Sequence, residues 1–104
     1  MTEDYFKKRD INLPSINDAD NQDNPLVVAH FQKETNLFNT WHWYVIGGDP
    51  LENGDYYLYT LVDGIYLKLG MATLNELLKV GAELDVNWKP DGLYNIKEKL
   101  SKKK

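Results

Sequence analysis

The sequence of 104 residues contains no cysteine, which excludes disulfides, thiolate metal sites and cysteine nucleophiles together. Serine occurs only at Ser15 and Ser101, both in segments expected to be peripheral, so a serine triad is not expected. No apolar run approaches the roughly 20 residues that a membrane-spanning helix needs. The acidic start does not match a secretory signal, which begins with basic residues and an apolar stretch. We therefore expect a cytoplasmic protein that has no membrane partner.

Basic residues are scarce in the part of the chain that is expected to fold. Residues 26–96 contain no arginine and carry a net charge of −5, whereas residues 97–104 carry +4. Duplex binding needs Lys and Arg on the folded body, so duplex nucleic acid is a disfavoured partner. The lysine-rich end is interpreted as a solubilising tail. No P-loop, dinucleotide fingerprint or paired-carboxylate motif occurs, so the sequence predicts no cofactor, no catalytic residue and no enzyme.

The length is that of one ordinary domain. Residues 1–25 are predicted to be a peripheral N-terminal segment, with a short helix followed by a polar connector dense in Asn, Asp, Ser and Pro. The core is expected to begin at Leu26. Residues 26–104 are therefore predicted to form a single α+β domain with a basic C-terminal tail.

Four β-rich runs are separated by turn signals. Asn53-Gly54 and Asp63-Gly64 predict two-residue type I′ turns, because these residues tolerate the positive φ that such turns require. The pattern predicts an antiparallel meander, with a further short strand somewhere in 84–88. The four main strands are expected near 26–33, 40–48, 55–62 and 65–70.

Helix signals follow the meander. Thr73 and Glu76 form a capping box, and Gly81 supplies a stop after a leucine stripe. Residues 93–100 predict a short amphipathic helix. The predicted fold is α+β: an antiparallel meander of four to five strands packed on one face by a short helix, with peripheral N- and C-terminal helical segments.

Tight turns would set the register and therefore the two faces of the sheet. With a two-residue turn, Val62 opposes Ile65, and Trp41 and Trp43 fall on the core face. A bulge in the run from Gly47 to Pro50 would change these faces. The opposite face is the predicted binding surface, suited to protein contacts or to stacking single-stranded bases, unless one of the termini covers it. It consists of His42, Tyr44, Tyr57, Tyr59, Tyr66 and Lys68.

The two histidines, His30 and His42, are expected on neighbouring strands. A zinc or iron site there would need carboxylates, and Asp49 and Asp55 are the candidates. Their spacing matches no known metal motif. The sequence therefore predicts no metal site.

Four stretches, "NPLVVAHF", "WYVIGGDP", "LGMATLNELLKVG" and "AELDVNWKP", resemble a family known as domain of unknown function 2958. The resemblance runs from Asn24 to Pro90. Gln32 stands where members tend to carry Phe, and Gly47 stands where they tend to carry an acidic residue. The resemblance implies a small accessory protein of phages, plasmids or conjugative elements, with no established catalytic residues to carry over.

These observations favour a small non-enzymatic interaction protein of a phage or mobile element. Its expected partner is a host protein, and the specific hypothesis is inhibition of a CRISPR or restriction nuclease by protein–protein binding. One alternative is a single-stranded nucleic-acid-binding accessory protein that uses the tyrosines. Another is a metal-dependent enzyme built on His30, His42 and Asp49. The sequence leaves the oligomeric state open.

Overall fold

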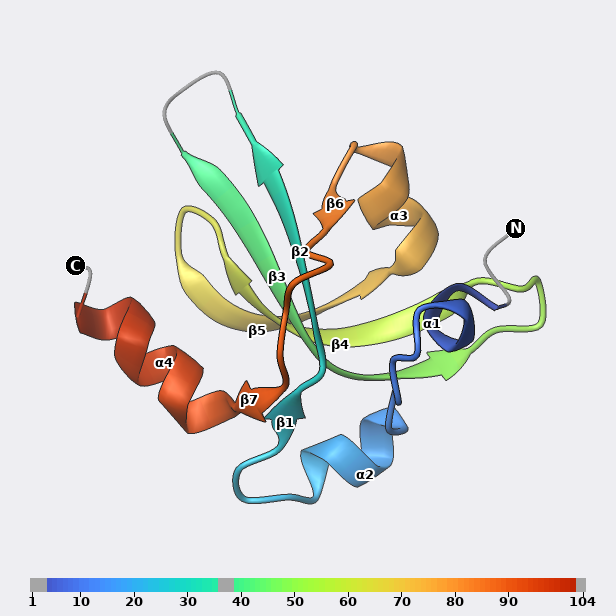
Figure 1. Cartoon of the computed structure of the whole chain (residues 1–104), viewed down its shortest axis with the longest axis horizontal. Coiled ribbons are helices and arrows are strands. Elements are labelled where there is room, and N and C mark those ends of the chain that lie inside the picture. Colours follow the sequence, from blue (N-terminus) through green and yellow to red (C-terminus); the bar gives the residue numbers. More distant parts are fainter. Residues whose placement is uncertain (1–3, 36–38, 103–104) are drawn as a thin grey trace.

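The computed structural model describes residues 4–35 and 39–102. The described helices are α1 (Tyr5–Lys8), α2 (Ile16–Asp20), α3 (Leu74–Lys79) and α4 (Leu93–Lys102). The described strands are β1 (Leu26–Val27), β2 (Ala29–Glu34), β3 (Thr40–Pro50), β4 (Tyr56–Asp63), β5 (Leu67–Thr73), β6 (Glu83–Leu84) and β7 (Asp91–Gly92). Strands β5-β4-β3-β2-β6 form an antiparallel sheet in that order, and β1 pairs separately with β7 (Figure 1). The α+β prediction is confirmed.

Helices cover both faces of the sheet, and each face has its own core. The first core packs Phe6 of α1 and Leu74 and Leu77 of α3 against inward side chains such as Phe31. The second core packs α2 and α4 against the other face. Its buried members are Ala19, Val27, Tyr44, Ile46, Leu61, Leu93, Ile96 and Leu100.

The N-terminal segment contributes to both cores. Phe6 is only 2% exposed and Ala19 is fully buried. The expectations that the core begins at Leu26 and that residues 1–25 lie outside it are therefore wrong. The physical reason is that polar residues dominate this segment, while its few apolar side chains fill space against the sheet that α3 and α4 leave uncovered.

The connection between β4 and β5 is longer than predicted. Asp63 pairs with Leu67, so the loop has the three residues 64–66. Gly64 does not adopt a positive φ. A Cβ on Gly64 would lie 2.4 Å from Cζ3 of Trp41, so the glycine is required by the close approach of this indole rather than by a type I′ turn. The change places Lys68 opposite Val62, on the face that Trp43 occupies.

The connection between β3 and β4 also differs from a two-residue turn. Residues 51–55 separate the strands, and Gly54 has a φ of +86°. Val45 pairs with Thr60, whereas a two-residue turn at Asn53-Gly54 would pair it with Val62. A bulge lies between Val45 and Gly47, slightly earlier than the run in which the sequence suggested one.

The helix signals are confirmed. Thr73 Oγ1 accepts from the Glu76 amide at 3.1 Å, and a Glu76 carboxylate oxygen accepts from the Thr73 amide at 2.8 Å. Gly81 follows α3 with a φ of +86°. Helix α4 buries three apolar residues, as its amphipathic pattern predicts. In the described part of the chain, no helix is long and apolar enough to cross a membrane.

Candidate functional site

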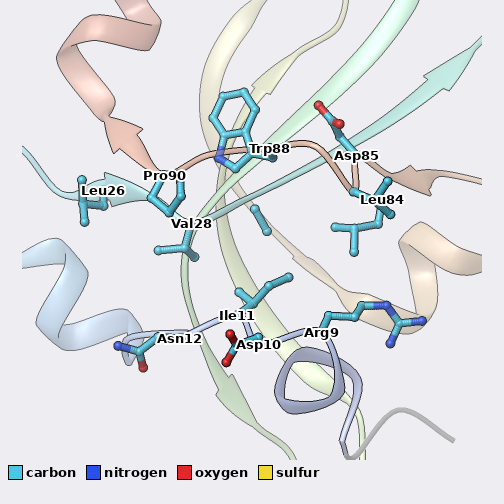
Figure 2. A pocket seen from close by; sticks show the side chains of 12 residues that line it. Arg9, Asp10, Ile11, Asn12, Leu26, Val28, Leu84, Asp85, Trp88 and Pro90 are labelled. Carbon is cyan, nitrogen blue, oxygen red and sulfur yellow. The ribbon is translucent and has the colours of Figure 1, made fainter.

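A groove lies between the N-terminal segment and the loop that follows β6. Residues 9–12 form one wall, and residues 84–90 and the end of β1 form the other, as Figure 2 shows. Its volume is about 470 Å³. We call it the Trp88 groove, and it is lined by Arg9, Asp10, Ile11, Asn12, Leu26, Val28, Ala29, Leu84, Asp85, Val86, Trp88 and Pro90.

The Trp88 groove has apolar walls and an exposed apolar rim. Ile11 faces Val28 and Leu84 across the opening in Figure 2. On the rim, the side chains of Leu26 and Val86 are 53% and 84% exposed. Apolar side chains of this size with high exposure mark a candidate binding surface when they surround a concave site.

The polar end of the groove is restrained by local contacts. Arg9 donates from Nη1 to the Tyr5 carbonyl at 2.9 Å, and its guanidinium lies 3.8 Å from the Tyr5 ring centroid. Asp10 adopts a φ of +57°, which turns the chain so that the Ile11 amide donates to the Phe6 carbonyl at 2.9 Å. Asp is one of the few residue types that adopts this conformation readily. The result is a fixed wall that aims Ile11 at the opening.

Trp88 forms the opposite wall. Its Nε1 donates to the Val27 carbonyl at 2.9 Å. Its ring lies 5.2 Å from the ring of His30 and 5.7 Å from that of Tyr44, between ring centroids. A second pocket of about 470 Å³ lies beyond Trp88, against α4, and shares Asp85, Trp88 and Pro90 with the groove.

Behind Trp88 runs a hydrogen-bonded chain of three side chains, which we call the histidine chain. His30 Nδ1 lies 3.1 Å from Asp85 Oδ2, and His30 Nε2 lies 2.8 Å from His42 Nδ1. The Asp85 amide also donates to the His30 carbonyl at 2.8 Å. Both the backbone and the side chain of Asp85 therefore attach the loop 85–90 to β2.

The protonation of the histidine chain follows from its geometry. The hydrogen bond from His30 lowers the pKa of Asp85, assisted by the Asn87 amide, so Asp85 is a carboxylate that accepts from His30 Nδ1. A neutral His30 then has an acceptor at Nε2, and His42 must donate from Nδ1. Burial lowers the pKa of His30 against the opposing influence of Asp85. Neutral His30 beside an ionised Asp85 is therefore the favoured form near pH 7.

The far end of the histidine chain is polar. His42 lines a pocket of about 630 Å³ with Gln32, Glu34 and Glu83 among its neighbours. Tyr44 stacks on His30 at 4.8 Å between centroids, and burial together with the charge of Asp63 raises the pKa of Tyr44 to about 12. Chemically, the chain can relay a proton between its ends, and structurally it holds the loop behind the groove.

The six residues of the predicted binding surface do not share one exposed face. Tyr44 is only 7% exposed, beneath Trp88 and α4, so the alternative that a terminus covers this face holds for Tyr44. His42, Tyr57 and Tyr59 do lie on that side of β3 and β4, and the Tyr59 hydroxyl donates to Asp20 at 3.4 Å. Tyr66 is in the 64–66 loop, 75% exposed, and Lys68 is on the opposite face.

The two histidines meet, but not with the carboxylates that the sequence suggested. Asp49 accepts from the Ile16 amide at the start of α2, and Asp55 accepts from the amides of Tyr56 and Asn75. Among the described residues, no group of three or more His, Cys, Asp or Glu is placed to hold a metal ion.

Sequence reasoning missed Asp85 and Trp88. The run Asp85-Val86-Asn87 is a turn signal, because the Asp85 carboxylate accepts from the Asn87 amide at 3.0 Å. That signal locates a turn but does not reveal the partner, since His30 lies 55 residues away in the sequence. No family model, curated protein or solved structure matches the chain. The site is therefore interpreted from its geometry.

We expect the free energy of unfolding to fall as the pH drops from about 7 to about 5. The pKa of His30 in the native state is lowered below its ordinary 6.5. As the pH falls below about 6.5, the unfolded state binds a proton at His30 before the native state does, so the free energy of unfolding decreases. The lowered pKa of Asp85 stabilises the native state in the same way at lower pH, and this contribution is lost as the pH falls below the ordinary pKa of 3.8. Urea unfolding across this pH range tests the expectation. A His30→Gln variant should show a flatter profile, and an equally steep one would contradict the assignment.

Proposed function

We propose that this chain is a small non-enzymatic interaction protein that binds an apolar segment of a partner protein in the Trp88 groove. The observation that carries the proposal is the combination of apolar walls with the exposed rim residues Leu26 and Val86. A groove of this kind accepts side chains of a partner in a desolvated site, which is where most binding energy at interfaces arises.

Charge favours a basic partner. Asp10 and Asp85 line the groove beside the single Arg9, whose guanidinium is already engaged with Tyr5. The whole chain carries a net charge of −4. Complementary charge speeds association, and nucleases are basic where they contact nucleic acid. Together with the family resemblance, this supports the narrower proposal of a phage or mobile-element inhibitor that acts on a host CRISPR or restriction nuclease.

The histidine chain has a structural part in this proposal. It fixes Asp85 and therefore the loop that carries Val86 and Trp88. A pre-organised loop lowers the entropy cost of binding. The metal-dependent enzyme has less support because Asp49 accepts a hydrogen bond from the Ile16 amide and not from a histidine. Binding of single-stranded nucleic acid has less support because Tyr44 is buried and Lys68 lies on the face opposite to Tyr57.

A capture experiment with surface variants tests the groove. Val86→Lys and Leu26→Lys should each weaken partner binding by about tenfold or more, because each places a charge where an apolar contact is needed. Val80→Lys is the matched control, since Val80 is 55% exposed and does not line the groove. The measurements are capture from host lysate and phage plating against CRISPR or restriction defence.

The nuclease proposal fails if no nuclease is captured and no protection is seen. The groove assignment fails separately if a partner is captured equally well by the native chain and by Val86→Lys.

A further inference from the structure

Strand β5 is an open edge of the main sheet. It pairs with β4 along Leu67–Thr73 without a register shift, and none of the described residues pairs with its outer side. Edge strands are usually protected by proline, by bulges or by several charges. This strand has no proline and no bulge, and its single charged residue is Lys68. The edge is therefore competent to pair with another strand.

Apolar side chains are exposed along this edge. Leu69 and Met71 are 44% and 41% exposed and lie on the same face of β5, opposite Leu61 and Tyr59 of β4. Tyr57, two residues from Tyr59 on the same face of β4, is 42% exposed. In the loop before β5, Ile65 and Tyr66 are 72% and 75% exposed. These side chains border the edge without a cover from the described helices.

The strand is complementary to itself. Gly70 is the central residue of Leu67–Thr73. A two-fold axis through Gly70, perpendicular to the sheet, pairs Leu67 with Thr73 and brings Leu69 opposite Met71 twice. Every residue of the strand then has a partner, and opposite residues point to the same side, as antiparallel pairing requires.

We propose that two copies of this chain associate by antiparallel pairing of β5 with β5 of the second copy about a two-fold axis at Gly70. The main sheet then continues across the axis. The exposed apolar pairs Leu69–Met71 are covered on one face. This assignment is independent of the Trp88 groove, which β5 does not line.

Charge permits this register. Each Lys68 lies opposite Ala72 of the second copy, so the two ammonium groups do not face each other. The two Lys68 positions are offset by four residues along the strand direction, about 14 Å at about 3.4 Å per residue. That distance exceeds the screening length of about 8 Å at physiological ionic strength. The apolar pairs therefore form without opposing repulsion at the edge.

The contact area favours a reversible dimer. One strand of seven residues and its flanking side chains form the interface from each copy. This is at the small end of specific interfaces, so the dimer population should depend on protein concentration. Ile65 and Tyr66 extend the strand at the end that lies beside Thr73 of the second copy, and they add apolar contact there.

Sedimentation velocity and light scattering over a range from about 1 µM to about 1 mM, chosen to span the affinities of small interfaces, measure the association. The mass of the native chain should rise with concentration towards twice the 12.1 kDa of the monomer. L69E and M71K should each shift the equilibrium to monomer, because each breaks both apolar pairs. Thermal melts confirm that the variants fold, as expected for side chains that are over 40% exposed.

The double variant L69E/M71K identifies the register. The two introduced charges are opposite in sign and face each other across the axis, so the double variant should regain the dimer that each single variant loses. Val86→Lys, which alters the Trp88 groove, should dimerise like the native chain. A native chain that stays monomeric at all concentrations overturns the proposal, as does a folded double variant that remains monomeric. The proposal is also overturned if the chain stays monomeric and β5 instead pairs with a strand of a different protein.

Discussion

Phe6→Ala should lower the free energy of unfolding by about 3–5 kcal/mol, the usual cost of deleting a buried large aromatic side chain. Phe6 is 2% exposed, and its ring lies 5.1 Å from that of Tyr56 and 5.3 Å from that of Tyr5, between centroids. The four residues of α1 are too few for a helix that is stable alone, so burial of Phe6 is what holds this segment on the sheet. Urea unfolding measures the change.

Tyr94→Ala is the control for Phe6→Ala. Tyr94 is also a large aromatic residue on a helix, but it is 57% exposed on α4, so its loss should change stability by less than about 1 kcal/mol. If the two variants unfold at the same urea concentration, the N-terminal segment is peripheral after all. A loss of several kcal/mol is a large part of the roughly 5–15 kcal/mol that stabilises a domain of this size.

Trp88→Ala should have an effect of similar size, about 3–5 kcal/mol, and should also change the titration of His30. The indole covers His30 and Tyr44 and bonds to the Val27 carbonyl. Its removal admits water to His30, so the desolvation that lowers the pKa of His30 is relieved and that pKa should rise towards 6.5. Urea unfolding and NMR titration of the histidine ring protons measure the two effects.

Trp88→Phe separates packing from hydrogen bonding. A phenyl ring keeps most of the cover over His30 but cannot donate to the Val27 carbonyl, so we expect a loss of about 1–3 kcal/mol. The pKa of His30 should stay near its native value in this variant. An unchanged His30 titration in Trp88→Ala would show that Trp88 does not control the environment of the histidine chain.

Local signals in the sequence predicted the elements well. The capping box at Thr73, the stop at Gly81 and the amphipathic pattern of α4 depend on neighbours within four residues, and all three are confirmed. The order of the four main strands follows from β-rich runs and turn residues in the same way. These features need no knowledge of distant contacts.

The features that the sequence did not predict depend on contacts between residues that are far apart in the chain. Gly64 lies beneath the Trp41 ring, and this contact accompanies a three-residue loop where the Asp63-Gly64 pair alone indicates a two-residue turn. The site depends on Asp85 meeting His30, and no short motif encodes that meeting. Tyr44 was predicted to be exposed because the prediction assumed that one face of β3 contacts solvent. In the structure, α4 and Trp88 cover that face at Tyr44.

Burial of β3 on both sides affects how mispaired sheets are avoided. Residues 44–48 are all buried. Sliding the strand by one position would therefore exchange one apolar surface for another, and the burial of polar groups would disfavour the wrong register only weakly. Steric fit supplies the discrimination. A Cβ at Gly47 would lie 3.0 Å from the Pro14 carbonyl oxygen, and one at Gly48 would lie 2.8 Å from Leu58 Cδ2. A strand that slipped by one position would place Ile46 or Asp49 at one of these two contacts, so the shape of the chain selects the native alignment where its hydrophobic pattern does not.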